Sequence, residues 1–305
     1  VAMLAGAASV FFSTAYTVYL PELVAAGELM EGNAKLQGSV SVSSICGRSL
    51  AGVAAQALGY ATALLFNAGS FLVSAACLLS IRAAGPPRER APRSTIRAEV
   101  SAGTRLIWHA PLLRLTVILA TLLNLAYAGT TALNVLFLYR VIGFSPAAVG
   151  LLMTGTGVGG IVGALVARKF AERIGTARAL LASTLGAGLF GLLIPLTAAG
   201  PRAALFVVGS AVVGAGITGG NIVLASFRQA YVPPRLLGRV TATQRFVGYG
   251  VIPLGSLAAG ALGTALGVRD ALWICYVYFA ACGLLSLMPA IQANRDLPTA
   301  PLNSQ

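Results

Sequence analysis

Long apolar stretches without charge dominate this 305-residue chain and constrain its fold more than any other feature. A helix needs about 20 apolar residues to cross the hydrocarbon core of a membrane. The run Ser49–Ile81 is too long for one helix, so we divide it at Leu58-Gly59-Tyr60 and extend its first part back to about Leu36. With 10% charged and 57% hydrophobic residues, the composition excludes an ordinary soluble protein. The pattern predicts an all-α membrane protein with nine transmembrane helices.

The other runs are Val1–Pro21, Leu115–Tyr139, Val141–Ala167, Ala179–Pro201, Ala203–Phe227, Phe246–Val268 and Ala271–Asn294. Positively charged residues are concentrated in every second gap between the nine spans. Most of the 21 Lys and Arg residues follow spans 1, 3, 5 and 7 or the last span. By the positive-inside rule these gaps face the cytoplasm, which predicts a cytoplasmic C-terminus. The net charge of +13 is then a topology signal, and we expect no nucleic-acid partner.

A spaced glycine pattern occurs twice at a constant offset: Gly47, Gly52 and Gly59 in spans 2 and 3, and Gly255, Gly260 and Gly267 in spans 8 and 9. Both copies are helix pairs that begin and end on the cytoplasmic side, as a parallel repeat of two halves requires. The second half has six spans, so spans 2 and 3 are expected to be the fifth and sixth of the first half. We therefore expect twelve helices in all, with about three N-terminal helices missing from this chain.

A loop rich in proline and glycine separates the two halves. It contains Gly85-Pro86-Pro87, followed by a stretch from Ser94 to His109 whose pattern predicts an amphipathic helix on the cytoplasmic membrane face. The expected division is residues 1–82 for three helices of the first bundle, 83–111 for the linker, 112–291 for the second six-helix bundle and 292–305 for a cytoplasmic tail.

Several phrases carry a family resemblance: Leu20-Pro21-Glu22-Leu23-Val24, the stretch from Leu64 to Ser74, Ile107 to Arg114, and Ser226 to Ala230 leading to Leu236 to Thr243. With these the chain resembles the major facilitator superfamily, and within it the bacterial drug and macrolide exporter branch that also contains siderophore exporters. The resemblance implies a two-bundle helical fold in the bacterial inner membrane. It also implies secondary active export of small amphiphilic molecules by alternating access with proton antiport, no enzyme activity, no cofactor, and a monomer when complete.

Two motifs of that superfamily have counterparts here. The antiporter motif matches Gly47, Arg48 and Gly52, with Arg48 where the family has proline. The cytoplasmic gating motif has a second-half counterpart in Glu172, Arg173, Gly175 and Arg178, with Glu in place of Asp. By resemblance, an acid–base pair in the second motif is expected to close the inner face.

Polar and aromatic residues recur at helical spacing on several spans, so each set lies on one helix face. A polar stripe facing lipid leaves hydrogen bonds unmet, so these faces should point inward. The candidates for a substrate cavity are Tyr16, Tyr19, Ser44, Arg48, Asn124, Tyr127, Thr131, Asn134 and Asn221. The alternative is that they only hydrogen-bond between helices. By resemblance, spans 1, 2, 4, 7 and 8 face the cavity.

Arginines need separate interpretation. Arg48 lies well inside a span, where charge is costly, and no span in the sequence carries a carboxylate to pair with it. It is therefore a candidate for contact with a substrate or counter-ion, or for pairing with an acid on an absent helix. The alternative is that its side chain extends toward the cytoplasm, which is difficult from so deep within the span. Arg228 and Arg245 lie at span ends, and we interpret them as interfacial anchors.

Alternatives to proton-coupled export remain open at this point. All eight acidic residues lie in loops or at span ends, so the coupling acid is on absent helices or the protein is a uniporter. A lipid or lysolipid flippase and a non-transporting truncated remnant are further alternatives. A membrane-embedded transferase needs clustered carboxylates for a metal-diphosphate, and the sequence has none. The four cysteines lie within spans without a Cys-x-x-Cys pattern, so no metal site is predicted.

Overall fold

A computed structural model of the protein describes residues 19–21, 23–80, 96–292 and 295–298. In these ranges every regular element is helical. The long helices are α2 (Leu29–Ser80), α3 (Ile96–His109), α4 (Pro111–Leu136), α5 (Pro146–Ile174), α6 (Thr176–Gly191), α7 (Ala203–Tyr231), α8 (Pro234–Gly250), α9 (Ile252–Leu266) and α10 (Val268–Leu284). Short helical turns are η1 (Ala26–Glu28), η2 (Phe137–Val141), η3 (Ile194–Leu196), η4 (Gly200–Arg202), η5 (Leu285–Leu287) and α11 (Pro289–Gln292).

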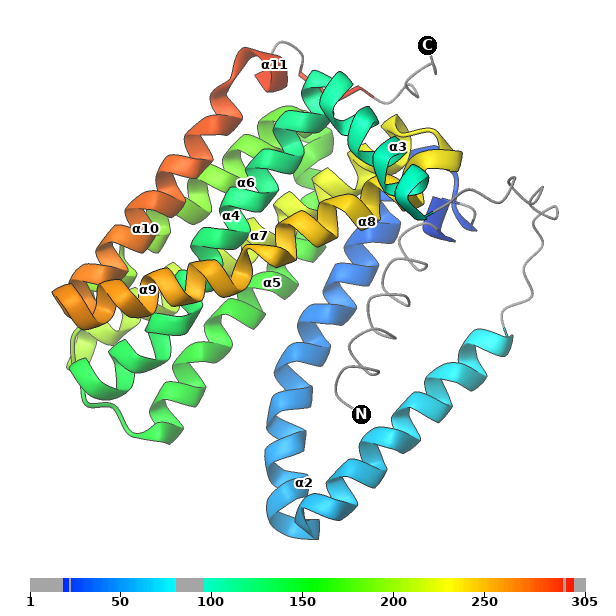
Figure 1. Cartoon of the computed structure of the whole chain (residues 1–305). Coiled ribbons are helices and arrows are strands. Elements are labelled where there is room, and N and C mark those ends of the chain that lie inside the picture. The colour runs from blue at the N-terminus through cyan, green and yellow to red at the C-terminus, as the bar shows by residue number, and fades with distance from the viewer. Residues whose placement is uncertain (1–18, 22, 81–95, 293–294, 299–305) are drawn as a thin grey trace.

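Within the described ranges, six helical segments are long and apolar enough to cross a membrane: Pro111–Val141, Pro146–Ile174, Thr176–Leu196, Gly200–Tyr231, Pro234–Leu266 and Val268–Leu287. They coincide with predicted spans 4 to 9, and the prediction of these six is confirmed. Figure 1 shows that these segments, which comprise α4 to α10, form one bundle. Large apolar side chains remain exposed on the outside of this bundle, for example Leu151, Leu165 and Phe246. Such a surface suits contact with lipid.

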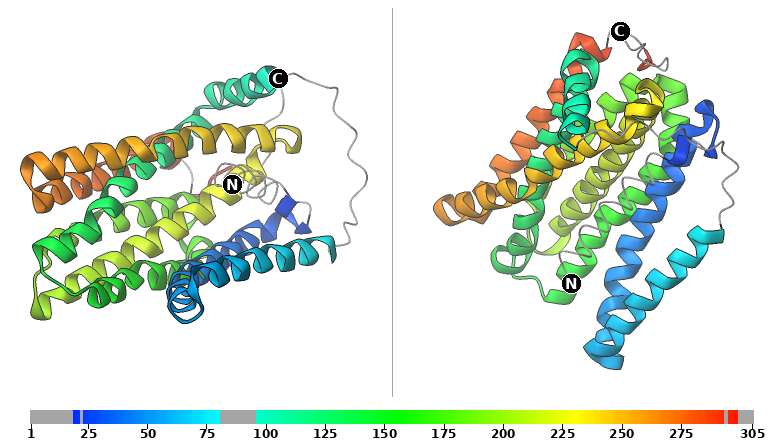
Figure 2. Two further views of the ribbon diagram at one scale, coloured as in Figure 1. Left: turned by 60° about the horizontal axis from the view of Figure 1, so that its bottom comes forward. Right: turned by 45° about the vertical axis from the view of Figure 1, so that its right-hand side comes forward.

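Helix α2 covers predicted spans 2 and 3 and differs from the expectation in one respect. The helix runs without a break through Leu58–Tyr60, where the sequence predicted a boundary between two helices. Its ribbon nevertheless doubles back near the middle, so that the first limb lies beside the bundle and the second limb diverges from it (Figures 1 and 2). The reversal is therefore made by a sharp bend within the helix. Predicted span 1 lies almost wholly outside the described residues, so nine spans are not shown.

The first limb of α2 packs against α5 through small residues. Gly38 lies opposite Ala164, with 3.5 Å between an ideal Gly38 Cβ and the Ala164 Cβ. One turn further, the Ser41 side chain lies against Gly160. Small residues let two helix backbones approach closely, which is the usual way that helices associate in membranes. This contact places the first limb of α2 along the wall of the six-helix bundle.

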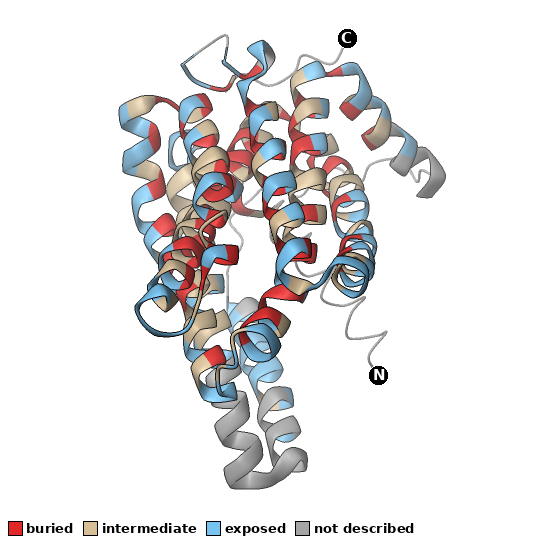
Figure 3. Ribbon diagram, turned by 90° about the vertical axis from the view of Figure 1, so that its left-hand side faces the viewer, coloured by how far each residue is buried: buried red, intermediate tan, exposed pale blue. Residues whose placement is uncertain are grey.

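Two apolar clusters mark the two ends of the bundle. One joins the α3–α4, α5–α6 and α7–α8 connections to the C-terminal segment and includes Ile107, Ala177, Val232 and Leu297. The other joins the α4–α5, α6–α7 and α9–α10 connections. The connections that carry most of the positive charge therefore lie at one end of the bundle, as their alternation in sequence predicts. We call the first of the two clusters, which lies at this end, the charged-end cluster. Figure 3 shows the buried residues on the helix faces that point toward one another.

Proline and serine residues fix where several helices begin. Pro111 and Pro234 stand in the first turn of α4 and α8, where a missing N–H costs nothing. Ser145 caps α5 by accepting a hydrogen bond from the Ala148 amide at 3.3 Å. Pro253 in the first turn of α9 separates that helix from α8, because proline removes a backbone donor within an otherwise continuous span.

Helix α3 occupies most of the stretch where the linker was predicted to form an amphipathic helix. Its Ile107 is buried in the charged-end cluster, whereas the neighbouring Trp108 is 59% exposed. A Cβ on Gly103 would come within 2.9 Å of the Arg239 carbonyl oxygen, so α3 lies directly against α8. The linker helix is thus docked on the six-helix bundle by its apolar face.

Candidate functional site

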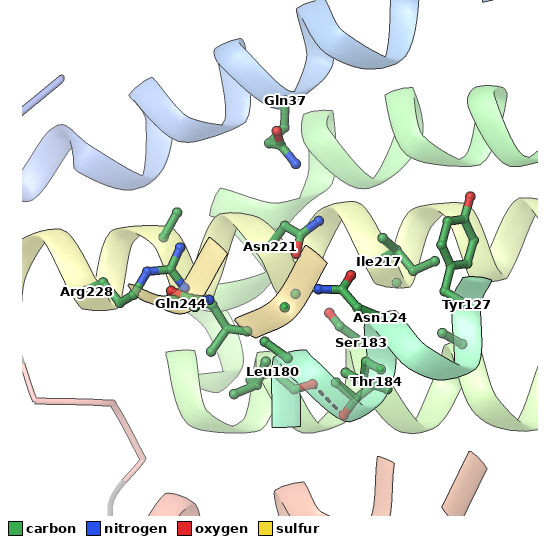
Figure 4. A pocket seen from close by; sticks show the side chains of 18 of the residues that line it. Gln37, Asn124, Tyr127, Leu180, Ser183, Thr184, Ile217, Asn221, Arg228 and Gln244 are labelled. Atoms are coloured by element: carbon green, nitrogen blue, oxygen red, sulfur yellow. Dashed lines mark hydrogen bonds between the residues drawn. The ribbon is translucent and has the colours of Figure 1, made fainter. Parts of the chain in front are cut away.

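A cavity of about 280 Å³ lies between the first limb of α2 and helices α4, α6, α7, α8 and α10. Its lining combines amide and hydroxyl side chains with apolar ones. In Figure 4 the labelled side chains extend from Arg228 and Gln244 at one end to Tyr127 at the other, with Asn124 and Asn221 between them. A mixed lining of this kind suits a ligand that has both an apolar body and a few polar groups.

Three of the candidate cavity residues lie together in this lining: Asn124, Tyr127 and Asn221. Asn124 and Tyr127 are one turn apart on α4, and Asn221 approaches from α7. The Asn124 amide lies close to α8, because a Cβ on Gly248 would be 3.1 Å from its Nδ2 atom. A small residue at position 248 therefore leaves the space that the Asn124 side chain occupies.

The other candidates lie elsewhere. Asn134 is buried between α4 and α10, where its Nδ2 donates to the Tyr276 hydroxyl at 3.0 Å, so it follows the alternative of bonding between helices. Thr131 is exposed on α4 and is not part of the cavity lining. Tyr19 and Ser44 are half-buried and also outside the lining.

The remaining candidates belong to the first predicted span and to the antiporter-motif match. Tyr16 lies outside the described residues. Arg48 and Gly52 of the antiporter-motif match belong to α2, but the surroundings of both residues lie outside the description. Gly47 of the same motif is exposed, and a Cβ there would meet nothing within 4 Å. The roles of Arg48 and of this motif therefore stay predictions.

Two arginines correct the sequence interpretation. Arg228 of α7 and Arg245 of α8 both line the cavity, whereas we had interpreted them as interfacial anchors. The Arg228 Nε atom is buried and has no hydrogen-bond partner among the described residues. The physical reason is that α7 and α8 meet at this end, so a residue near a span end faces the neighbouring helix and the cavity instead of the lipid headgroups. The sequence did contain a signal for the position of Arg228 in the cavity, because Asn221 and Arg228 are seven residues apart and therefore share a helix face.

Helix α6 also contributes to the lining, through Leu180, Ser183, Thr184 and Ala187. The resemblance had not placed this span among the cavity helices. Thr184 donates back to the Leu180 carbonyl at 2.9 Å and lies 3.0 Å from the Ser286 hydroxyl, so its polar atom is satisfied within the protein. Small and apolar residues of this kind form no polar stripe, so sequence spacing gave no signal for α6.

Hydrogen bonds join α2 to α7 beside the cavity. The buried Asn33 amide of α2 donates to Ser226 Oγ at 3.0 Å and to Gln229 Oε1 at 2.6 Å on α7, and to the Leu29 carbonyl at 2.9 Å in its own helix. Asn33 also lines the cavity. We call these contacts of Asn33 with Ser226 and Gln229 the amide seal.

A cluster of charges links α2 to α5 near the amide seal. Arg168 of α5 pairs with Glu31 of α2 and, through its Nε at 2.8 Å, with Glu172 one turn further along α5. Lys35 pairs with Glu31 at 2.8 Å. The hydrogen bond from Lys35 and the charges of Lys35 and Arg168 lower the pKa of Glu31 below its ordinary value. We call Glu31, Lys35, Arg168 and Glu172 the charge cluster.

The gating-motif residues thus divide between two contacts. Glu172 pairs with Arg168, an arginine upstream of the motif, and belongs to the charge cluster. Gly175 makes the α5–α6 turn at φ +95°, and its Cα faces the Arg295 backbone so closely that a Cβ would overlap it. Arg295 in turn donates through Nη2 to the carbonyls of Glu172 and Arg173 at 3.2 and 2.9 Å. Arg173 and Arg178 themselves are exposed.

The C-terminal segment completes this turn. The Thr176 amide donates to Asp296 Oδ1 at 2.8 Å, and the Leu297 amide donates to Thr176 Oγ1 at 2.7 Å. Leu297 is buried in the charged-end cluster. The segment therefore holds the α5–α6 turn by these hydrogen bonds and by the burial of Leu297.

These features define a class: a multi-pass α-helical membrane protein with a cavity between helices and polar contacts at one end. A family model described as transmembrane secretion effector, of the major facilitator superfamily, matches residues 1–304. The chain therefore belongs to the transmembrane secretion effector family of that superfamily, which is a family of efflux transporters and not of enzymes.

Individual relatives are distant. The multidrug efflux pump Tap of Mycolicibacterium fortuitum is 24% identical over 294 residues, which cover 94% of this chain and 70% of Tap. The enterobactin exporter EntS of several Escherichia coli strains is 26% identical over 296 residues, which cover 94% of this chain and 68% of EntS.

Among solved structures, a bacterial homologue of the iron transporter ferroportin in an outward-facing state is similar, with a TM-score of 0.71 and 14% identity. The match covers 90% of this chain and 66% of that one, so the chain spans about two thirds of the length of the proteins it resembles. At this identity the likeness shows the fold, and it confirms the expected major facilitator fold.

Proposed function

We propose that the protein is a secondary active transporter that exports small amphiphilic molecules by alternating access between two helical bundles. The observation that carries the proposal is the cavity between α2 and the six-helix bundle, lined by Asn124, Tyr127 and Asn221 among apolar residues. Amphiphilic molecules match such a lining, because their apolar part is desolvated while a few amides orient the polar part.

The two bundles are assigned as follows. Residues 1–82 supply three helices of the first bundle, 83–111 the linker, 112–291 the second bundle and 292–305 a cytoplasmic tail. This makes nine spans of a twelve-helix architecture. The six confirmed spans and the two limbs of α2 support this count, and the first span lies almost wholly outside the described residues.

The membrane orientation follows from charge. Positive residues concentrate at the bundle end that carries the α5–α6 and α7–α8 connections and the C-terminal segment, so we assign this end to the cytoplasm. The amide seal and the charge cluster lie toward the same end. In this assignment they close the cytoplasmic entrance to the cavity.

Closure and opening then depend on these contacts. Asn33 and Glu31 belong to the first bundle, and their partners Ser226, Gln229 and Arg168 belong to the second. When the bundles rock apart at this end, both sets of contacts break together. The gating-motif carboxylate Glu172 takes part by holding Arg168 in position for Glu31.

The proposed substrate class is based on the relatives, and the proposed coupling is based on the family resemblance. Tap is named as a multidrug efflux pump and EntS as an enterobactin exporter, so a drug-like or siderophore-like amphiphile is the substrate class that we propose. Proton antiport is proposed from the family resemblance. Among the described residues that line the cavity there is no Asp or Glu, so the proton-carrying group is expected on a segment outside this lining.

Efflux from cells tests the proposal. The protein is expressed from its full reading frame in a bacterial host that lacks its own efflux pumps, and the loss of preloaded ethidium and of preloaded carboxyfluorescein is followed by fluorescence. We expect faster loss of at least one dye, abolished by a protonophore and by Asn221→Trp, which fills the cavity. Arg202→Trp, on the exposed turn η4, is the matched control. Loss of neither dye above the empty-vector rate contradicts transport, and loss that resists the protonophore contradicts proton coupling.

A further inference from the structure

The charge of the cavity lining is one-sided. Among the described residues that line it, two are charged, and both are arginines: Arg228 on α7 and Arg245 on α8. Their charges repel one another. A negative group placed in the cavity would be attracted by both positive charges, and the attraction is stronger beside a low-dielectric wall than in water. The lining therefore favours a ligand of negative charge.

Arg228 is the more informative of the two. Its Nε atom is buried and has no hydrogen-bond partner among the described residues, although the side chain lies in the cavity (Figure 4). A guanidinium presents its donors in a planar fork that matches the two oxygens of a carboxylate, sulfonate or phosphate. Because Arg228 lines the cavity and its Nε donor is not used within the described protein, its guanidinium is placed to pair with such a group.

The rest of the lining suits the body of such a ligand. Leu123 of α4, Ile217 of α7 and Phe279 of α10 supply apolar surface, and Tyr127 supplies an aromatic ring. Figure 4 shows Tyr127 at the opposite end of the pocket from Arg228. An elongated molecule with an anionic head and an aromatic or acyl body can reach both ends.

We propose that this cavity selects amphiphilic anions, and that Arg228, with the positive charge of Arg245 beside it, binds the anionic head group. The proposal rests on the proposed function, because it names the substrate class of the transport cavity. The shared chemistry is a carboxylate, sulfonate or phosphate on an apolar body. A soluble anion and an anionic phospholipid both have this chemistry, and the experiment separates them.

Binding to the purified protein tests the proposal without requiring transport. The protein is placed in phosphatidylcholine nanodiscs, and three probes of one size are titrated by calorimetry against empty-disc controls: naphthalene-2-sulfonate, neutral 2-naphthol and 2-naphthylmethylammonium. We expect the sulfonate to bind about 10-fold or more tightly than the ammonium probe, since a charge-assisted hydrogen bond separates the two. Equal or tighter binding of the ammonium probe, or no binding of the sulfonate, overturns the proposal.

Variants locate the anion. Arg228→Gln should weaken sulfonate binding about 10- to 100-fold, because it removes a charged donor. It should change the affinity for 2-naphthol by no more than about twofold relative to the unmutated protein. Retained 2-naphthol binding also shows that the variant is folded. Arg228→Lys keeps the charge without the planar fork and should fall between the two. Arg202→Gln, exposed on η4, is the matched control and should change nothing. Unchanged sulfonate binding in Arg228→Gln refutes the assignment.

Changing the lipid of the discs distinguishes a phospholipid ligand from a soluble anion. If an anionic phospholipid occupies the same site, discs that contain phosphatidylglycerol should weaken apparent sulfonate binding strongly. If the site is reserved for soluble anions, they should weaken it only slightly, and either result supports an anion site. Failure of the two proposals can be told apart. Dye efflux that is unaffected by Arg228→Gln, without sulfonate binding, refutes only the anion selectivity. Sulfonate binding that depends on Arg228, without efflux of either dye, refutes only transport.

Discussion

Replacing Asn33 by alanine should open the cytoplasmic entrance of the cavity in the proposed cycle. The Asn33 amide donates to Ser226 Oγ at 3.0 Å and to Gln229 Oε1 at 2.6 Å, and both partners are on α7. Each buried hydrogen bond contributes about 0.5–1.5 kcal/mol net, so the two together favour the closed state by about 1–3 kcal/mol. At about 1.4 kcal/mol per decade, Asn33→Ala should raise the population that is open to the cytoplasm about 5- to 150-fold.

Cysteine accessibility measures that population. In a background where the four native cysteines are replaced, Ala225→Cys places a thiol in the cavity lining. Inside-out vesicles expose the cytoplasmic face to a membrane-impermeant maleimide, and the labelling rate follows the open population while the closed state predominates. Ser39→Ala is the matched control, because this exposed hydroxyl donates only back to the Lys35 carbonyl in its own helix. A labelling rate in Asn33→Ala equal to that of the control would refute the amide seal.

Three further predictions concern the framework. Gly163→Ala should lower the free energy of unfolding by about 1–3 kcal/mol in detergent melts, because its Cβ would lie 2.5 Å from the Ala215 carbonyl oxygen on α7; Gly150→Ala, with nothing within 4 Å, should be neutral or stabilising. Gly175→Ala should free the C-terminal segment to proteolysis, since φ +95° strains any side chain by about 1–3 kcal/mol; an unchanged cleavage pattern would contradict this. The folded-state pKa of Glu31 is lowered, so its stabilisation is present above the ordinary value of 4.5 and is lost as pH falls through the lower folded value; melts of Glu31→Gln should lose this acid dependence.

Sequence spacing predicted the helix faces better than the site. On α4 the stripe Asn124, Tyr127, Thr131 and Asn134 identified a polar face, but only its first two members line the cavity. Asn134 meets Tyr276 of α10, and no pattern within α4 could reveal that partner. A stripe on one helix indicates its inward face, and the neighbouring helices decide which part of that face borders the cavity.

The membrane spans were easier to predict because their signal is local. Each of the six confirmed spans is a long run of apolar residues whose length alone fits the hydrocarbon core. The sharp bend within α2 was harder to predict, since the sequence there indicated two helices separated by a break. The lining by α6 was missed for the opposite reason, because Ser183 and Ala187 look like ordinary small packing residues.

The two contacts that close the cytoplasmic end in our proposal are unequal in strength. The side chains of Arg168 and Glu31 are 42% and 39% exposed, and an ion pair with that much solvent contributes about 0–1 kcal/mol. Asn33 is only 6% exposed, so little solvent competes with Ser226 and Gln229 for its donors. The amide seal should therefore set the closed population, while the charge cluster orients the approach of the helices. Arg228 lies on α7 between Ser226 and Gln229, so an anion bound there would act on the same turn of helix that holds the seal, which is where binding has to influence closure in an alternating-access cycle.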